Sequence, residues 1–566
     1  MFYALIAAIP IILTVVLMVF FSQPAKRAMP LAWLLTALIA CFVWGMETRE
    51  IGARSVAGCL GAFETICIIF GAILLMNILR QSGAMATINR IFAHVTRDAR
   101  IQTVIVGYVF AGFIEGVAGF GSPAALAAPI LISLGFPPLA AASVCLIYNS
   151  TPVCPGPVGV PTLTCAAMVK EAVTGLGGDA DKFTHLLTVW TCIPHMVGGI
   201  VIIFVGVAVL CKVFGKNHSF RDALPALPFC LFTGLFLGTI YILTAIFAGP
   251  ELVTMTAFLG TLPVVIFAAR KGFLMPKEVW TFEGSEEKIS PAVSGDGEER
   301  RQSLLMSLLP YVVICLILFA TRLNLFGLKD TLNADPFILH IGNIFGYEDI
   351  SWNFKFLYNP GIMPFIAVAL VTIFLHRMSA KQAKQALKDS LRQVSGAAVA
   401  LLFGVAMINI YRYTSSEAVG RLFDPGTASY TYANSSMLYA MAQAVARLFS
   451  GVYVLFAPLI GVLGAFMSGS CTVSNTLFAG LQFEVATVLT LPQVLILALQ
   501  NMGGAIGNMI CINNIVAVCA TAGTNGKEGK LIRTNILPCL LYALIVGVIM
   551  AILIAAGLNP MPELLG

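Results

Sequence analysis

The sequence predicts an all-α polytopic membrane protein with about 12–14 transmembrane helices in two inverted repeats. Of the 566 residues, 58% are apolar and 11% are charged, whereas a soluble domain has roughly 45–50% apolar and 25% charged residues. The apolar residues form continuous runs rather than alternating strands, which excludes an outer-membrane barrel. The net charge is only +6 and the basic residues lie in short loops, so no nucleic-acid partner is expected.

The apolar runs define the expected spans. Met1–Phe21 is long enough to cross a bilayer, at about 20 residues, and we expect a retained helix because no basic start or cleavage site marks a signal peptide. The run 436–467 is long enough for two helices. Further spans are expected at roughly 30–47, 56–79, 101–114, 138–150, 186–211, 223–248, 250–269, 304–320, 359–375, 393–411, 490–511 and 534–558.

The loop charges predict the orientation. Of the 33 Lys and Arg residues, 23 lie in six clusters that can share one side, at 26–27, 80–100, 212–221, 270–301, 377–392 and 527–533. The positive-inside rule places that side in the cytoplasm, with both termini outside. The polar stretch 270–303 is expected to be a cytoplasmic loop between a first half, 1–269, and a second half, 304–566.

Two similar segments, 352 residues apart, carry the functional signal. Gly112–Pro123 reads "GFIEGVAGFGSP" and Gly464–Asn475 reads "GAFMSGSCTVSN". Each leads into an apolar helix, so re-entrant segments are expected near 112–134 and 464–481. In each half a helix that begins at proline then reaches an asparagine, Asn149 or Asn501, and breaks at Pro or Gly.

Broken backbone at membrane depth is tolerated only inside protein or against a cavity. One Gly-rich helix is usually a packing surface, but two matching breaks indicate the central site of a transporter. Free N–H groups at the broken helix ends favour an anion, and hydroxyl and amide side chains add partners. The expected substrate-binding residues are Gly119, Gly121, Ser122, Asn149, Ser470, Thr472, Ser474, Asn475 and Asn501.

Glu115 opens the first of these segments. An acid at membrane depth is a functional candidate by default, so Glu115 is expected to couple transport to a proton; the alternative is a hydrogen-bonded anchor of the hairpin. Glu64 is a second acid in an apolar run, and His195 is more simply read as a packing histidine. No catalytic motif such as HExxH or GxSxG occurs, so an enzyme is not expected, and neither is a cofactor or a metal site.

At the level of motifs, the chain resembles the bacterial L-lactate permease family. The resemblance rests on "GFIEGVAGFGSPAALAAPILISLGFPPLAAASVCLIYNSTPV", on "GSCTVSNTLFAGLQ" and on "GKEG" near residue 527. It implies an inner-membrane symporter that moves a proton with L-lactate, D-lactate or glycolate. It also implies a fold similar to the ion-transporter superfamily of inverted-repeat, elevator-type carriers, which are often homodimers in the membrane lipid.

The chain departs from this family pattern at two positions. The family has an acid where this chain has Cys471, and a lysine where it has Asn508. A negative and a positive group are therefore missing together, which avoids leaving one buried charge unpaired. The alternative function is thus a sodium-coupled or differently selective carrier of small carboxylates. A channel and a membrane enzyme are the candidates from other classes.

Overall fold

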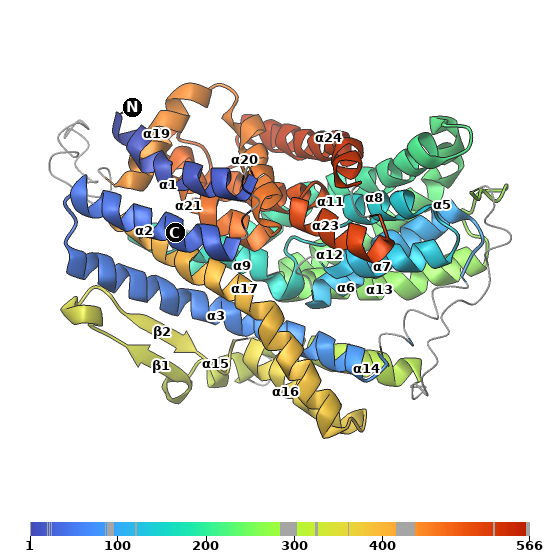
Figure 1. Ribbon diagram of the computed structural model, residues 1–566, viewed down its shortest axis with the longest axis horizontal. Helices are drawn as coiled ribbons and strands as arrows, with labels where there is room; N and C mark the ends of the chain where they lie inside the picture. The colour runs from blue at the N-terminus through green and yellow to red at the C-terminus, as the bar shows by residue number, and fades with distance from the viewer. Residues whose placement is uncertain are drawn as a thin grey trace.

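The computed structural model describes residues 2–19, 21, 23, 25–84, 87, 95–118, 122–282, 303–322, 327–359, 361–414, 436–524 and 527–561. One group of elements packs around two 34-residue helices (Figure 1). It consists of α1 (Phe2–Val19), α2 (Ala25–Phe42), α3 (Thr48–Gln81), α14 (Leu304–Arg322), α15 (Leu328–Leu332), β1 (Ile338–Ile341), β2 (Trp352–Lys355), α16 (Ala367–Leu375) and α17 (Ala380–Tyr413).

The second group contains the interrupted helices together with the long helices that follow them. From the first half come α5 (Ala99–Gln102), a π-helix (Thr103–Phe110), α6 (Ala111–Ala118), α7 (Ser122–Ser133), α8 (Pro138–Tyr148), α9 (Val160–Ala167), α10 (Lys170–Gly175), α11 (Ala180–Val209), α12 (Leu227–Phe247) and α13 (Pro250–Arg270). From the second half come α19 (Met437–Phe449), α20 (Tyr453–Ser468), α21 (Cys471–Val488), α22 (Gln493–Ile506), α23 (Ile512–Ala522) and α24 (Glu528–Ala555).

The helices confirm an all-α polytopic membrane protein. Among the described residues, seven helical stretches are long and apolar enough to cross a membrane, judged by length and composition. They are Thr48–Gln81, Ala180–Phe214, Phe220–Phe247, Pro250–Arg270, Ala380–Tyr413, Gln493–Cys519 and Glu528–Ala555. The run 436–467 does contain two helices, α19 and α20. The number of about 12–14 spans and the inversion of the repeats stay predictions.

The basic cluster 377–392, expected as a loop, is mostly helical. The helix α17 begins at Ala380 because Ser379 and Gln382 form a capping box. The Ser379 side chain accepts from the Gln382 backbone N–H at 3.3 Å, and the Gln382 side chain accepts from the Ser379 N–H at 3.0 Å. The S-x-x-Q pattern is a sequence signature of a helix start, so the helix extends beyond its apolar part.

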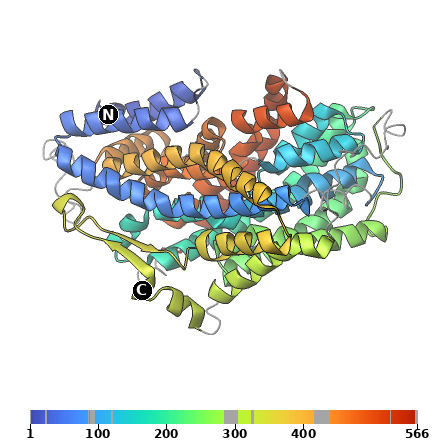
Figure 2. The same ribbon diagram turned by 60° about the horizontal axis from the view of Figure 1, so that its bottom comes forward.

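The two longest helices, α3 and α17, lie side by side in both views (Figures 1 and 2). A Cβ atom on Gly58 of α3 would lie 2.6 Å from the Cα atom of Ala406 in α17, so the helices approach closely only because residue 58 is glycine. Farther along, the Asn77 amide donates to the Ser390 hydroxyl at 2.9 Å. Close backbone packing and a buried polar contact together fix this pair.

The antiparallel pair β1–β2, between α15 and α16, is attached to α3. Its register pairs Ile338 with Lys355 and Ile341 with Trp352. The Trp352 indole N–H donates to the Glu64 carboxylate at 2.9 Å, and Arg54 forms an ion pair with Asp349 at 2.6 Å. Glu64, whose role the sequence left open, therefore holds this hairpin.

Helix order and contacts repeat between the halves. The order α6, α7, α8, α9, α11 in the first half matches α20, α21, α22, α23, α24 in the second. Across the halves, α7 contacts α23 as α21 contacts α9, and α8 contacts α24 as α22 contacts α11. This reciprocal pattern is the one that two structurally related repeats produce.

Candidate functional site

The second predicted break is a tight connection between two helix ends. The helix α20 ends at Gly469, whose φ of +75° lies in the left-handed region that favours glycine. Ser470 then caps α21, because its side chain accepts from the Val473 N–H at 3.4 Å. The Ser468 hydroxyl donates to the Gly464 carbonyl at 2.7 Å. The 18-residue helix α21 thus starts inside the protein with its N-terminus at the connection.

The corresponding connection of the first half joins α6, which ends at Ala118, to α7, which begins at Ser122. Gly119 and Gly121 lie outside the described residues, as does the side chain of Ser122. The helix ends on both sides agree with the predicted break.

Each half has a further break after the helix that ends near an asparagine. In the first half α8 ends at Tyr148, Asn149 is its C-cap, and a turn of 3₁₀-helix (Pro157–Gly159) precedes α9. In the second half α22 continues through Asn501, Gly503 and Gly504 to Ile506, and a 3₁₀ turn (Gly507–Met509) precedes α23. The break of the first half therefore begins at the predicted asparagine, whereas that of the second half begins at Gly507, beyond the predicted Asn501.

Side chains of the long following helices satisfy carbonyls in these breaks, as backbone buried in a membrane protein requires. A ring nitrogen of His195, in α11, lies 3.0 Å from the Thr151 carbonyl oxygen. The Asn535 amide, in α24, donates to the Met509 carbonyl at 3.1 Å. His195 is a buried structural residue, as the sequence favoured, and its partner is the broken backbone.

The breaks of both halves meet at a small buried cavity of about 20 Å³. Glu115 reaches it from α6, and its Oε2 atom has no hydrogen-bond partner among the described residues. The volume suffices for about one water molecule. The lining residues are Glu115, Val153, Pro157, Pro161, Gly469, Ser470, Cys471, Thr472 and Asn508.

Behind this cavity an amide network joins the two halves. The Asn475 amide donates to the Pro161 carbonyl at 2.9 Å and to Asn501 Oδ1 at 2.8 Å. The Asn501 amide donates to the Thr162 hydroxyl at 2.8 Å. All of these residues are buried, so each lost bond would leave a polar atom without water. The start of α9 is therefore fixed to α21 and α22.

The predicted site residues occupy four kinds of position. Glu115, Ser470 and Thr472 line the cavity. Asn475 and Asn501 lie directly behind it in the amide network. Ser474 donates to the Gly461 carbonyl at 2.8 Å and faces α20. Asn149 is buried at the end of α8, and its Oδ1 has no partner within the described part of the chain.

Sequence reasoning missed several lining residues. Val153, Pro157 and Pro161 come from the stretch "STPVCPGPVGVP", which was recognised as a break but not as a wall of the site. Cys471 and Asn508 were singled out only as departures from a family pattern. Their positions in the two breaks of the second half were the signal that could have assigned them to the site.

The electrostatics of the cavity come from backbone and neutral side chains. Within the described residues, none of the lining side chains is Lys, Arg or His. Ser470 and Thr472 supply hydroxyls, and the N-terminus of α21 supplies free N–H groups and the positive end of the helix dipole. Such a helix end favours an anion, and among the described residues Glu115 is the only carboxyl side chain in the lining.

Known proteins that are similar to this chain are named as permeases. A model of the L-lactate permease family matches residues 3–556. The chain is 28% identical over 562 residues to a putative L-lactate permease of Haemophilus influenzae, covering 96% of each chain. It is 26% identical over 583 residues to the glycolate permease GlcA of Escherichia coli, covering 96% of this chain and 94% of that one. It is 27% identical over 535 residues to an L-lactate permease of Bacillus subtilis, covering 90% and 89%.

Proposed function

Because the chain belongs to the L-lactate permease family, we propose that it is a secondary active transporter rather than an enzyme or a channel. It imports L-lactate and related 2-hydroxy monocarboxylates such as D-lactate and glycolate. Relatives named as L-lactate and glycolate permeases support this substrate class. The protein acts in a bacterial inner membrane with both termini outside, and it works as a homodimer.

The single observation that carries the proposal is the cavity where the breaks of both halves meet. It combines the N-terminus of α21, the hydroxyls of Ser470 and Thr472, and the carboxyl of Glu115. The helix end suits the substrate carboxylate. The hydroxyls suit the substrate's 2-hydroxyl, which both donates and accepts hydrogen bonds.

Proton symport follows from charge balance. Moving one anion inward against an inside-negative potential costs roughly 2.3 kcal/mol per 100 mV. A proton that travels with the anion cancels this cost. Glu115 is the only carboxyl that lines the cavity in the described part of the chain, so it carries the proton.

Alternating access follows from the small size of the cavity. At about 20 Å³ it holds a water molecule, whereas lactate has six non-hydrogen atoms. Substrate entry therefore requires the broken segments to move away from the helices around them. This movement opens the cavity first to one side of the membrane and then to the other. The amide network between α9, α21 and α22 keeps the two halves of the site together during this movement.

The direct test is uptake of labelled L-lactate into proteoliposomes with and without an acidic exterior. We expect accumulation only with the pH gradient, together with saturation and counterflow. Uptake that ignores the gradient contradicts proton coupling, and uptake that never saturates supports a channel instead. Competition by D-lactate and glycolate tests the substrate class in the same vesicles.

Sodium coupling is the second candidate, and Asn149 favours it. Its buried Oδ1 has no partner among the described residues and lies at the C-terminal end of α8, where helix carbonyls also collect. Oxygen ligands of this kind at an unwound helix suit Na⁺. The test is uptake at equal pH on both sides of the membrane. Uptake that Na⁺ supports and K⁺ does not would establish this alternative.

A further inference from the structure

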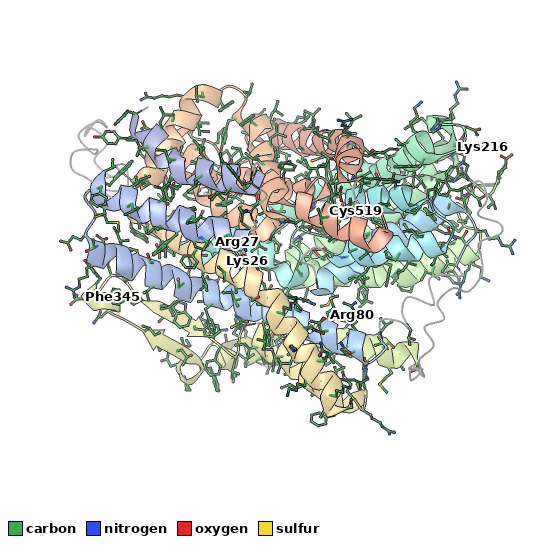
Figure 3. The ribbon with its side chains drawn as sticks, viewed as in Figure 1. Lys26, Arg27, Arg80, Lys216, Phe345 and Cys519 are labelled. Carbon is green, nitrogen blue, oxygen red and sulfur yellow. The ribbon has the colours of Figure 1, made fainter. Side chains whose placement is uncertain are left out.

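A second, larger cavity lies between the polar ends of α3 and α17. Its volume is about 570 Å³, within the usual range for ligand sites. Figure 3 shows Arg80 there, near the end of α3. The lining residues are Arg80, Gln81, Asp389, Arg392 and Gln393.

The two arginines reach this cavity from different helices. Neither the Arg80 nor the Arg392 guanidinium group forms an ion pair or a hydrogen bond with any residue that the structure describes. Asp389, the only acid among the described lining residues, accepts instead from Gln385 at 2.9 Å. The lining therefore has one more positive than negative charge, and two guanidinium groups are free to bind an oxyanion in bidentate fashion.

The hydrogen bonds around the cavity hold its two walls together. At its inner end the Asn77 amide donates to the Ser390 hydroxyl at 2.9 Å. At its outer end the Gln382 amide donates to the Gln81 carbonyl at 3.3 Å. The cavity thus lies between two helices that are bonded to each other on both sides of it, and it opens to the surface at the exposed residues Arg80, Arg392 and Gln393.

The level of the cavity in the membrane indicates the source of the anion. Both walls belong to candidate membrane spans of 34 residues, about 51 Å long, whereas the hydrocarbon layer is about 30 Å thick. Arg80 follows the apolar run 56–79, and Arg392 precedes the apolar run 393–411. Both arginines therefore lie where hydrocarbon gives way to headgroups, and both belong to the basic clusters predicted to be cytoplasmic.

From this geometry we infer that Arg80 and Arg392 form a binding site for the phosphate of an anionic phospholipid headgroup between α3 and α17. Basic pockets between membrane helices on the cytoplasmic side suit such headgroups. Asp389 suits a headgroup hydroxyl, as in phosphatidylglycerol, because a carboxylate accepts hydrogen bonds. The lipid stabilises the α3–α17 pair, and the inference does not depend on which substrate is transported.

The test is the melting temperature of delipidated protein with added phosphatidylglycerol or phosphatidylcholine at equal amounts. We expect phosphatidylglycerol to raise it by about 3 °C or more and phosphatidylcholine to leave it unchanged. The double variant Arg80→Gln/Arg392→Gln loses the response. Lys384→Gln, which removes an exposed charge of α17 outside the cavity, keeps it. An equal response of the double variant and the wild type overturns the site.

Glycerophosphoglycerol distinguishes a lipid site from a site for a soluble phosphate ester. It carries the same phosphodiester group without acyl chains, and we expect no shift at the concentration at which the lipid acts. An equal shift overturns the lipid assignment. If the double variant does not fold, Arg392→Lys serves instead: it keeps the charge but not the bidentate geometry, so native mass spectrometry should show weaker retention of one phosphatidylglycerol. Unchanged retention overturns the role of Arg392.

Discussion

At the residue scale, Glu115 differs from the other acids that the structure describes by its place in the cavity where the breaks meet. It is 2% exposed and lines the site, whereas Glu64 is bonded to Trp352 and Glu171 is exposed. Only a carboxyl in contact with the substrate path can exchange a proton each time the path opens. The chemistry of coupling is therefore expected at this one side chain.

We predict that Glu115→Gln retains exchange of labelled for unlabelled lactate but loses accumulation. Glutamine has the shape of the acid but cannot release a proton. A gradient of one pH unit drives about tenfold accumulation in a 1:1 symport, and this factor should fall to about one. Proteoliposome uptake measures both. Glu171→Gln, outside the cavity, should behave like the wild type, and accumulation by Glu115→Gln would remove the residue from the mechanism.

The reactivity of Cys471 can report whether a ligand occupies the cavity. Its thiol lines the cavity and donates to the Asn501 carbonyl oxygen at 3.4 Å. We predict that lactate at ten times its Kd slows alkylation of Cys471 by a small maleimide about tenfold, because bound ligand occupies the same space.

Mass spectrometry of individual peptides follows the labelling of Cys471. Cys59 and Cys67, half-buried on α3 and outside the cavity, should keep their rates. Cys471→Ser should remove the lactate-sensitive signal alone. Equal slowing at all three cysteines would instead indicate a global change in stability.

At the element scale, glycines set how closely the helices of the site pack. A Cβ on Gly503 of α22 would overlap the Pro458 carbonyl of α20, so both helices would have to move. A Cβ on Gly480 of α21 would meet only the end of the Leu438 side chain, at 3.3 Å. The α20–α22 contact thus depends on backbone touching backbone, whereas the contact at Gly480 can adjust.

We predict that Gly503→Ala lowers the free energy of unfolding by about 1–3 kcal/mol. Gly480→Ala should be neutral or stabilising by up to about 1 kcal/mol, because alanine is the better helix former. Thermal unfolding of the purified variants compares the two. If both variants have the same melting temperature, the close approach of α20 and α22 does not limit the stability of the protein.

At the scale of the whole molecule, the polar ends of the helices lie apart from the β1–β2 hairpin. Figure 3 shows Lys216 at one end of the long axis and Phe345 at the opposite end. Lys216 belongs to a basic cluster and Phe345 to the connection between β1 and β2. If the long axis crosses the membrane, these two residues face different compartments.

We predict that Phe345→Cys reacts with a membrane-impermeant thiol reagent in intact cells, whereas Lys216→Cys reacts only after permeabilisation. The positive-inside rule predicts that the end with Lys216 faces the cytoplasm. The wild-type chain is the background control, because its cysteines are buried or half-buried among the described residues. Labelling of both variants from outside would refute the orientation.

The sequence alone determined the class of protein, its all-α membrane fold and the places where helices break, because apolar runs and Gly or Pro interruptions act locally. It also proposed Glu115, Ser470 and Thr472 as site residues, and these three line the cavity. The tertiary structure decided which residues share one cavity. Val153 and Pro157 reach Cys471 only through contacts between the two halves.

Likewise, only the packing of the helices determines that Asn475 and Asn501 form hydrogen bonds with α9 and that Ser474 forms one with Gly461. The bonds of Asn475 and Asn501 to α9 join positions 314 and 339 residues apart, and no local pattern specifies which buried donor meets which acceptor. Composition and periodicity determine the secondary structure of each segment. Which hydrogen-bond partner each buried polar group has depends on satisfying all of these groups at once.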